Sequence, residues 1–331
     1  MLSYPMNIDH GGGSKFAAGV IDNLVKQGHF VEQLDWRKEN VDFEVILVFG
    51  FTFVSFEILA ELRKKNVKIV MFPIFDRMHS VFAHKCSFFI SKILRIKGFD
   101  YIRQSNLSLS DKIIVSNQLE KRDILSIYEV DESKIYVFNL GIPDDIFLLS
   151  KTVSSDLFFK EYGIRDFVVF PSAKVSSRKN QIQLLKAVEG TDLKIVFTGT
   201  DSVEPQVKEE FWHLVSLNKN VLCLPKLSRE MLVSCLKCSK VCVSLSSSET
   251  AGLANLEAAF LGNNLVVNGI VPFREYLGKF ATYVNKDDPE EVRNSILIAL
   301  EKKYDESVVP YILENFTWET YSSNVVKAII G

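Results

Sequence analysis

The feature that most constrains the fold is a regular alternation of short runs rich in β-branched and aromatic residues with longer amphipathic segments. Such alternation is typical of parallel sheets covered by helices on both faces, so we predict an α/β protein. In the first half, helices are predicted at 14–28 and 55–66, and strands at 1–5, 29–34, 43–50, 67–73, 112–116 and 134–139.

The alternation restarts in the second half. Strands are predicted at 167–173, 193–199, 220–225, 240–247, 263–269 and 280–285, a turn at 271–278, and helices from Asn180, Pro205, Ser228 and Gly252 and over 288–304. A polar segment at 150–163 interrupts the pattern, which favours a linker there. A chain of 331 residues is long enough for two domains. We therefore predict two doubly wound domains facing a cleft, with ligands outside the carboxyl ends of the strands.

The composition limits the possible binding partners and the cellular compartment of the protein. The formal net charge of -2 disfavours nucleic acid as the main partner. Five cysteines without framework spacing fit a reducing cytoplasm. Cys235 and Cys238 invite a zinc hypothesis, but their helical, apolar setting favours ordinary packing, so no metal site is expected. Neither a signal peptide nor a bilayer-spanning segment is visible, so we expect a cytoplasmic protein, at most bound to a membrane surface.

The most informative stretch is SLSSSETAGLANLEAAFLGN, which carries two glutamates around a predicted strand-to-helix turn. Glu249 follows the strand, and Glu257 lies about one turn into the helix, so both carboxylates can point into one cleft. The backbone N–H groups of Gly252, Leu253 and Ala254 at the helix start favour a phosphate or a sugar oxygen. Taken alone, two solvated surface acids would be the simpler interpretation.

A second group of charges lies in FPSAKVSSRKNQ, after the first strand of the second half. Lys174 and Lys179 lie in the loop that leads from this strand into a helix. Cations in this loop can neutralise a diphosphate leaving group, which makes a divalent metal dispensable. For the loop alone, solvated lysines in a turn would be the more frequent case.

Together these segments resemble the retaining glycosyltransferases of family four, which have the two-domain GT-B architecture. In that family a Gly-Arg-x-x-x-x-Lys-Gly segment binds the donor phosphates, and here Lys174 stands at the arginine position and Lys179 at the lysine. The family's paired glutamates correspond to Glu249, which the resemblance places at the transferred sugar, and Glu257, which it places at the nucleotide ribose. The altered ETAGLA context leaves the identity of the sugar open.

Other segments of the resemblance are weaker. By resemblance, Gly12 and Gly13 in DHGGGSK belong to a glycine loop that faces the donor, although a flexible turn is the alternative. Asp76 and His79 lie where the family often has a His-Asp pair, on the side of the acceptor and sugar. The loops at Gly199 and at Lys226 and Leu227 are expected to contact the nucleobase.

The resemblance also implies the domain limits. Residues 1–148 form an amino-terminal acceptor domain, residues 149–317 form the donor domain, and a closing helix at 318–331 crosses back onto the first domain. Residues 82–103 are basic and rich in aromatic residues, with five cations against one acid. Such a segment can dock on an anionic membrane, although an ordinary half-buried helix is equally consistent with it.

The sequence therefore predicts a retaining hexosyl-type transferase that uses a nucleotide-sugar donor and a saccharide or lipid-linked acceptor. The expected setting is bacterial polysaccharide or glycoconjugate synthesis, in the cytoplasm or on the inner membrane face, without a cofactor or metal. Two alternatives stay open: a sugar-nucleotide epimerase of the same architecture, and a non-catalytic partner subunit that binds a sugar or nucleotide.

Overall fold

The structure is a computed structural model that describes residues 12–34, 43–52, 54–75, 80–94, 96–172, 174–202 and 204–331. The chain divides into two compact units. The first comprises Met1–Gly141 and Trp318–Gly331, and the second comprises Ile142–Thr317. Each unit is an α/β domain built on a parallel sheet, as the alternation in the sequence predicts.

The first unit contains a four-stranded parallel sheet with the order β1-β2-β3-β4 among its described residues. The strands are β1 (Val45–Phe49), β2 (Lys68–Phe72), β3 (Lys112–Val115) and β4 (Ile135–Val137). The helices are α1 (Gly12–Lys26), α2 (Phe56–Lys64), α3 (Val81–Leu94), α4 (Phe99–Leu109), α5 (Gln118–Ile127) and α15 (Trp318–Ile330), with a short 3-10 helix η1 (Glu132–Lys134).

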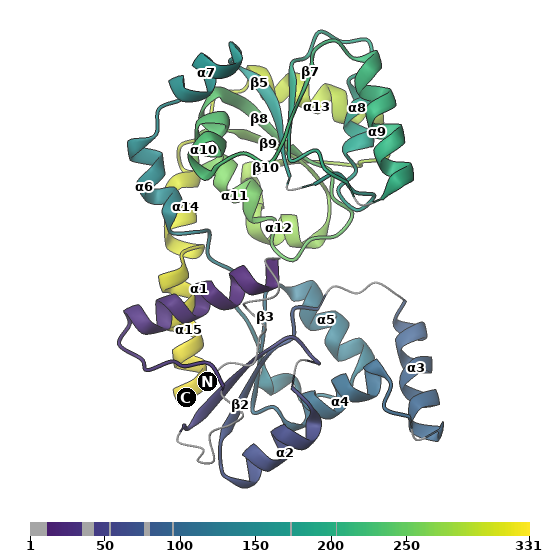
Figure 1. Ribbon diagram of the computed structural model, residues 1–331, viewed down its shortest axis with the longest axis vertical. Helices are drawn as coiled ribbons and strands as arrows, with labels where there is room; N and C mark the ends of the chain where they lie inside the picture. Colours follow the sequence, from purple (N-terminus) through teal and green to yellow (C-terminus); the bar gives the residue numbers. More distant parts are fainter. Residues whose placement is uncertain are drawn as a thin grey trace. The chain divides into compact units, whose positions relative to one another are not determined.

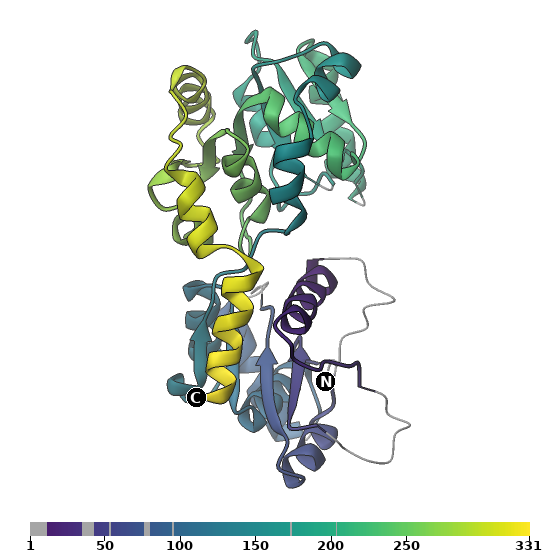
Figure 2. The ribbon, with the colours of Figure 1, turned by 90° about the vertical axis from the view of Figure 1, so that its left-hand side faces the viewer.

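Helix α15 packs beside α1 on one face of this sheet (Figure 2). The ring of Phe16 on α1 lies 5.5 Å from that of Phe49 on β1 and 5.8 Å from that of Tyr321 on α15. Gln27 donates a hydrogen bond of 2.9 Å to the hydroxyl of Ser322. The last residues of the chain are therefore part of the core of the first unit.

The second unit contains a six-stranded parallel sheet with the order β10-β9-β8-β5-β6-β7 (Figure 1). The strands are β5 (Phe167–Pro171), β6 (Ile195–Thr198), β7 (Val221–Leu224), β8 (Ser239–Ser244), β9 (Asn264–Asn268) and β10 (Ala281–Val284). Its helices are α6 (Asp145–Thr152), α7 (Asp156–Tyr162), α8 (Gln181–Ala187), α9 (Pro205–Leu217), α10 (Arg229–Cys238), α11 (Leu253–Phe260), α12 (Val271–Leu277), η2 (Gly278–Phe280), α13 (Pro289–Glu301) and α14 (Val308–Asn315).

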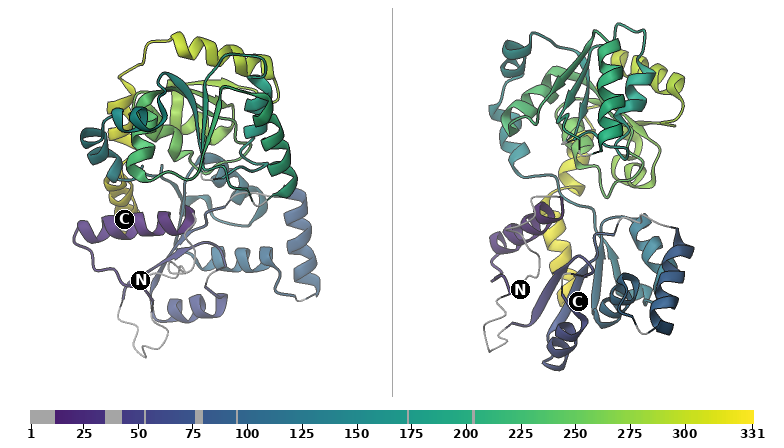
Figure 3. Two further views of the ribbon diagram at one scale, coloured as in Figure 1. Left: turned by 45° about the horizontal axis from the view of Figure 1, so that its top comes forward. Right: turned by 45° about the vertical axis from the view of Figure 1, so that its right-hand side comes forward.

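Helices cover both faces of this sheet (Figure 3). Helices α8, α9 and α13 share one apolar core with the sheet, while α10 and α11 pack against β8 and the strands beside it. The strand order makes β5 the point of reversal, because the chain moves from β5 to β6 and β7 and then returns to β8 on the other side of β5. The carboxyl ends of β5 and β8 therefore lie side by side, and the loops that follow them diverge.

Three sequence predictions of local structure were wrong. Residues 29–34 form no strand, and the exposed fraction of Phe30 is 89%. The polar segment at 150–163 is mostly helical, because Phe158 is fully buried and its ring lies 5.4 Å from that of Phe167. The predicted turn at 271–278 is helix α12, which begins with a proline at its first turn. The strand predicted at 1–5 lies outside the described residues.

The unit boundary falls at Gly141, slightly before the predicted position at residue 148. Helix α6 follows this boundary and packs on α10 of the second unit. The backbone N–H of Ile142 also donates a hydrogen bond of 2.8 Å to the carbonyl of Phe316, in the same unit. These contacts draw residues 142–148 into the second unit.

Candidate functional site

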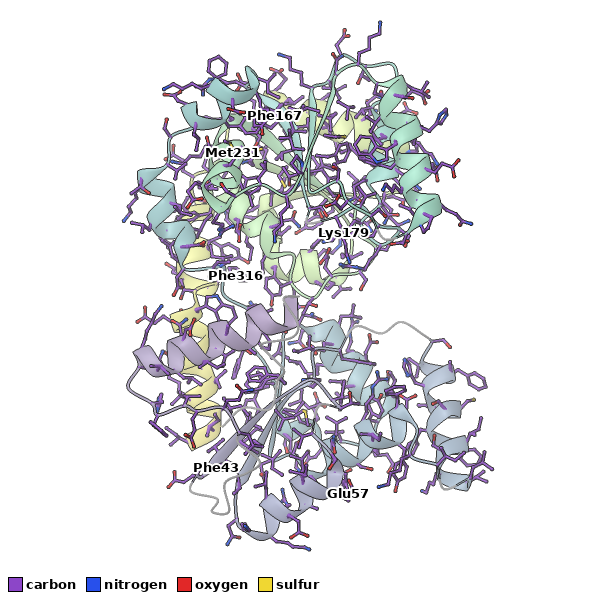
Figure 4. The ribbon with its side chains drawn as sticks, viewed as in Figure 1. Phe43, Glu57, Phe167, Lys179, Met231 and Phe316 are labelled. Atoms are coloured by element: carbon purple, nitrogen blue, oxygen red, sulfur yellow. The ribbon has the colours of Figure 1, made fainter. Side chains whose placement is uncertain are left out.

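The candidate site lies where the sheet of the second unit reverses, between the loop after β5 and the loop after β8. The two loops are joined directly. The N–H of Ser247 donates 2.9 Å to the carbonyl of Arg178. The amide of Asn180 donates 3.0 Å to the carbonyl of Leu245 and 2.7 Å to the hydroxyl of Ser247. Figure 4 labels Phe167 at the start of β5 and Lys179 in the loop beyond its far end.

Glu249 is a largely but not fully buried acid of this site. Its carboxylate lies 2.5 Å from the Lys179 ammonium and 3.3 Å from the Arg178 guanidinium, and its side chain is 13% exposed. Burial by itself raises the pKa of Glu249, but the charges of Lys179 and Arg178 outweigh it and hold that pKa below its ordinary value of 4.5. The side chain is therefore an anion at neutral pH.

The two helices that follow these loops begin in the same unusual way. The residue before α8, Asn180, has φ 57°, and the residue before α11, Gly252, has φ 72°, so both adopt the left-handed conformation. A Cβ atom on Gly252 would lie 2.4 Å from the ring of Phe273, which requires glycine there. Neither residue caps its helix with a side-chain hydrogen bond. As predicted, Leu253 and Ala254 form the first turn of α11, where backbone N–H groups lack partners within the helix.

Glu257, on the buried face of α11, has a different environment. Arg229 at the start of α10 donates a hydrogen bond of 2.6 Å from Nη1 to Glu257 Oε2. The same guanidinium binds Asp145 through two hydrogen bonds of 2.8 Å each. Burial lowers the pKa of Arg229, but its bonds with Asp145 and Glu257 outweigh this effect and raise that pKa above the ordinary range.

The other predicted residues of this unit surround the two acids less closely. Lys174 follows β5 as predicted, but it is exposed, and the cations paired with Glu249 are Arg178 and Lys179. Gly199 has φ 72° and donates 2.9 Å to the carbonyl of Leu224, which ties its loop to the segment that carries Lys226 and Leu227. Lys226 is exposed, and Leu227 is half-buried.

The site residues predicted in the first unit either lie in another type of structure than expected or fall outside the described residues. Gly12 and Gly13 are the first residues of α1, so they form the start of a helix rather than the predicted loop. The first N–H groups of any helix have no partner within the helix, and glycine can occupy these positions. Asp76 and His79 lie outside the described residues.

The cysteines behave as core residues. Cys235 and Cys242 are buried, and burial raises the pKa of both thiols well above the ordinary value. A thiol of raised pKa is a poor metal ligand, because metals bind the thiolate. Within the described ranges, no three His, Cys, Asp or Glu side chains form a group that could hold a metal ion.

Three residues of the site were missed from the sequence. Arg178 precedes Lys179 directly, and this adjacency was a readable signal, since both follow the same strand. Arg229 and its partner Asp145 come from segments far apart in the chain, and nothing in their local patterns marks them as a pair.

Comparison with known proteins shows which family the second unit resembles. Residues 155–310 match the model of the family described as glycosyl transferases group 1. D-inositol 3-phosphate glycosyltransferase of Mycolicibacterium smegmatis is 23% identical over 165 residues, which are 49% of this chain and 38% of that protein. The match thus spans well under half the length of that relative.

Solved structures resemble the whole chain. A glycosyltransferase from Rickettsia africae matches with a TM-score of 0.65 at 16% identity, over 97% of this chain and 95% of that one. A UDP-forming trehalose-phosphate synthase from Burkholderia xenovorans matches with a TM-score of 0.69 at 13% identity, over 98% and 81%. These similarities show the fold, and the GT-B architecture predicted from the sequence is confirmed.

The depressed pKa of Glu249 predicts a pH-dependent contribution to stability. A carboxylate whose pKa is lower in the folded state stabilises that state above pH 4.5, and the contribution is lost as the pH falls through the folded-state pKa. Glu249→Gln is expected to lower the free energy of unfolding by about 1–3 kcal/mol at pH 7 and by much less near pH ~3.5. Urea unfolding at the two pH values measures this difference. Glu301→Gln, on an exposed position of α13, is the control. An equal loss at both pH values would contradict the assignment.

Proposed function

Because residues 155–310 form a domain of the glycosyl transferases group 1, we propose that this protein transfers a hexose-type sugar from a nucleotide diphosphate donor to a saccharide or lipid-linked acceptor, with retention of configuration. The observation that carries the proposal is the largely buried Glu249 with its two cations at the reversal point of the donor-side sheet, next to the start of α11. The proposed setting is bacterial polysaccharide or glycoconjugate synthesis.

The charges of the site fit the chemistry of such a transfer. The bond between the sugar C1 and the β-phosphate oxygen breaks, and its electron pair stays on that oxygen. The acceptor hydroxyl forms the new bond to C1 on the same face, and its proton passes to the departing phosphate. Negative charge thus develops on the diphosphate, where Lys179, Arg178 and the exposed Lys174 supply fixed positive charge.

These cations define the proposed cofactor requirement. Positive charge held by the protein at the leaving group replaces the charge of a divalent ion, so the reaction is proposed to be independent of metal. Glu249 holds the two cations in the absence of donor and is proposed to receive a hydroxyl of the transferred sugar. Glu257 is proposed to accept hydrogen bonds from the ribose hydroxyls of the nucleotide.

A surface of the first unit fits a membrane-bound acceptor. The α3 patch consists of the exposed apolar residues Phe82, Phe89, Ile90, Ile93, Leu94, Ile96 and Phe99. Lys85 and Lys92 are exposed among them, and positions 81–99 contain no acidic residue, although the exposed Lys97 pairs with Glu57 of α2. Exposed apolar surface that carries cations is typical of segments that bind anionic bilayers.

A groove beside the α3 patch also fits a membrane-bound acceptor. A groove of about 680 Å³ opens between α3 and the end of α5, lined by Lys85, Phe89, Ile93 and Leu125 among others. It offers an apolar surface for the hydrocarbon part of a lipid-linked acceptor. Among the described residues no helix is both long enough and apolar enough to cross a bilayer. We therefore propose a cytoplasmic protein that docks peripherally on the anionic inner membrane face.

The donor roles predict the kinetics of two variants. Lys179→Ala and Glu249→Ala are each expected to lower kcat/KM by about 100-fold or more, because a preorganised charge at the reacting centre is lost. The donor is first identified by thermal shift with UDP-, GDP- and dTDP-sugars, since a bound ligand raises Tm. Release of nucleotide diphosphate in the presence of acceptor is then measured.

The matched control is Lys186→Ala, which removes the lysine of an exposed ion pair between Lys186 on α8 and Glu210 on α9 of the same unit. It should retain the activity of the unmodified protein. If Lys179→Ala or Glu249→Ala also stays within threefold of that activity, the assigned roles are wrong. Diphosphate-free interconversion of two donor sugars would instead indicate an epimerase, and binding of a donor without turnover would indicate a non-catalytic subunit.

The α3 patch predicts charge-dependent vesicle binding. The chain is expected to sediment with vesicles that contain about half anionic lipid, and to remain in the supernatant with purely zwitterionic vesicles. Phe89→Glu combined with Ile93→Glu should abolish sedimentation, because two acids replace apolar contacts. Ile298→Glu, at an exposed apolar position on α13, should have no effect. Equal binding of all three proteins would contradict the docking surface.

A further inference from the structure

The interaction between Arg229, Asp145 and Glu257 has a geometry that a simple surface ion pair lacks. Arg229 is the first residue of α10, where the Ser228 hydroxyl caps the helix by accepting 3.2 Å from the N–H of Met231. Its Nε and Nη2 bind the two carboxylate oxygens of Asp145, at 2.8 Å each. Its Nη1 is directed to one oxygen of Glu257, at 2.6 Å.

Burial differs across the three side chains. Glu257 is 8% exposed, Arg229 is 27% exposed and Asp145 is about half exposed. A two-bonded pair with Asp145 fixes the guanidinium plane, and this plane then fixes the direction from which Glu257 receives its third bond. A lysine in place of Arg229 could not form this arrangement, because its ammonium has no planar fork.

We propose that Arg229, held by Asp145, is a positioning residue that orients the Glu257 carboxylate for the two ribose hydroxyls of the donor nucleotide. The inference rests on the proposed function, in which Glu257 contacts the ribose. A carboxylate can accept from a vicinal diol only when its plane is set toward both hydroxyls, and a fixed partner on one oxygen sets that plane before the ligand arrives. Arg229 acts through Glu257 and needs no contact with the nucleotide.

The experiment measures how much the protein gains from the ribose hydroxyls. Dissociation constants for UDP, GDP and ADP, and for their 2′,3′-dideoxy forms, are determined by calorimetry. For the diphosphate that binds tightest, removal of both hydroxyls should weaken binding to the unmodified protein by about 10–100-fold, because hydrogen bonds to a carboxylate are lost. In Arg229→Ala this ratio should fall to about threefold or less, since the bond from Arg229 no longer sets the direction of the Glu257 carboxylate. Glu257→Gln should give a similarly reduced ratio.

Milder variants and a control separate orientation from general destabilisation. Arg229→Lys keeps the charge and loses the fork, and Asp145→Asn loosens the fork from an exposed position, so both should give intermediate ratios. They decide the question if Arg229→Ala does not fold. Arg165→Ala removes an arginine that pairs with Asp156 elsewhere in the same unit and should leave the ratio unchanged.

The outcomes separate a failure of the proposed function from a failure of the role proposed for Arg229. If no nucleoside diphosphate binds the unmodified protein, the proposed function fails, and this inference fails with it. If a diphosphate binds and Glu257→Gln lowers the ratio, but folded Arg229→Ala, or failing that Arg229→Lys and Asp145→Asn, keep the full ratio, the inference alone is overturned.

Discussion

The rest of the candidate site depends on one charge that is largely shielded from water, the carboxylate of Glu249. Removing a carboxylate from water is costly unless opposite charges replace its hydration, and Lys179 and Arg178 provide them. All three residues come from loops that follow adjacent parallel strands, so the order of the sheet brings them together. The ion pairs in turn join the two loops, together with the hydrogen bonds from Ser247 and Asn180. The geometry of the sheet and the electrostatics of the site therefore support each other.

The backbone at this position explains one departure from the motif that the sequence resembles. The motif ends in Lys-Gly, whereas here Lys179 is followed by Asn180. The residue at that position has φ 57°. Asparagine and aspartate are among the side-chain-bearing residues that adopt this left-handed conformation most readily. Its amide also donates to the carbonyl of Leu245 in the neighbouring loop. The substitution thus keeps the turn and adds a contact that glycine could not make.

The sequence predicted the strands of both sheets for a physical reason. In a parallel sheet covered on both faces, strands are short apolar runs between helices, and each strand from β5 to β10 shows this pattern. Among the described residues, the segment at 29–34 has the composition of a strand but forms only an isolated bridge at Gln33, and residues 150–163 are polar yet bury Phe158. Pairing and burial are tertiary properties that a local pattern does not contain. The same limit applies to the site, where Glu249 and Lys179 follow predicted strands, while the pairing of Arg229 with Asp145 depends on how α6 packs on α10.

The two acids of the site differ in the type of cation that holds them, and this difference matches their proposed roles. Glu249 is paired mainly through a lysine ammonium, which is a compact point charge without a planar fork. Glu257 is paired through a guanidinium whose plane is already fixed by Asp145, so its partner cannot move without breaking two other hydrogen bonds. Positive charge held at the reacting centre stabilises the negative charge that develops on the leaving group, whereas recognition of a ribose needs an acceptor that stays in place. The residue types are therefore consistent with the proposed chemical role of Glu249 and the proposed recognition role of Glu257.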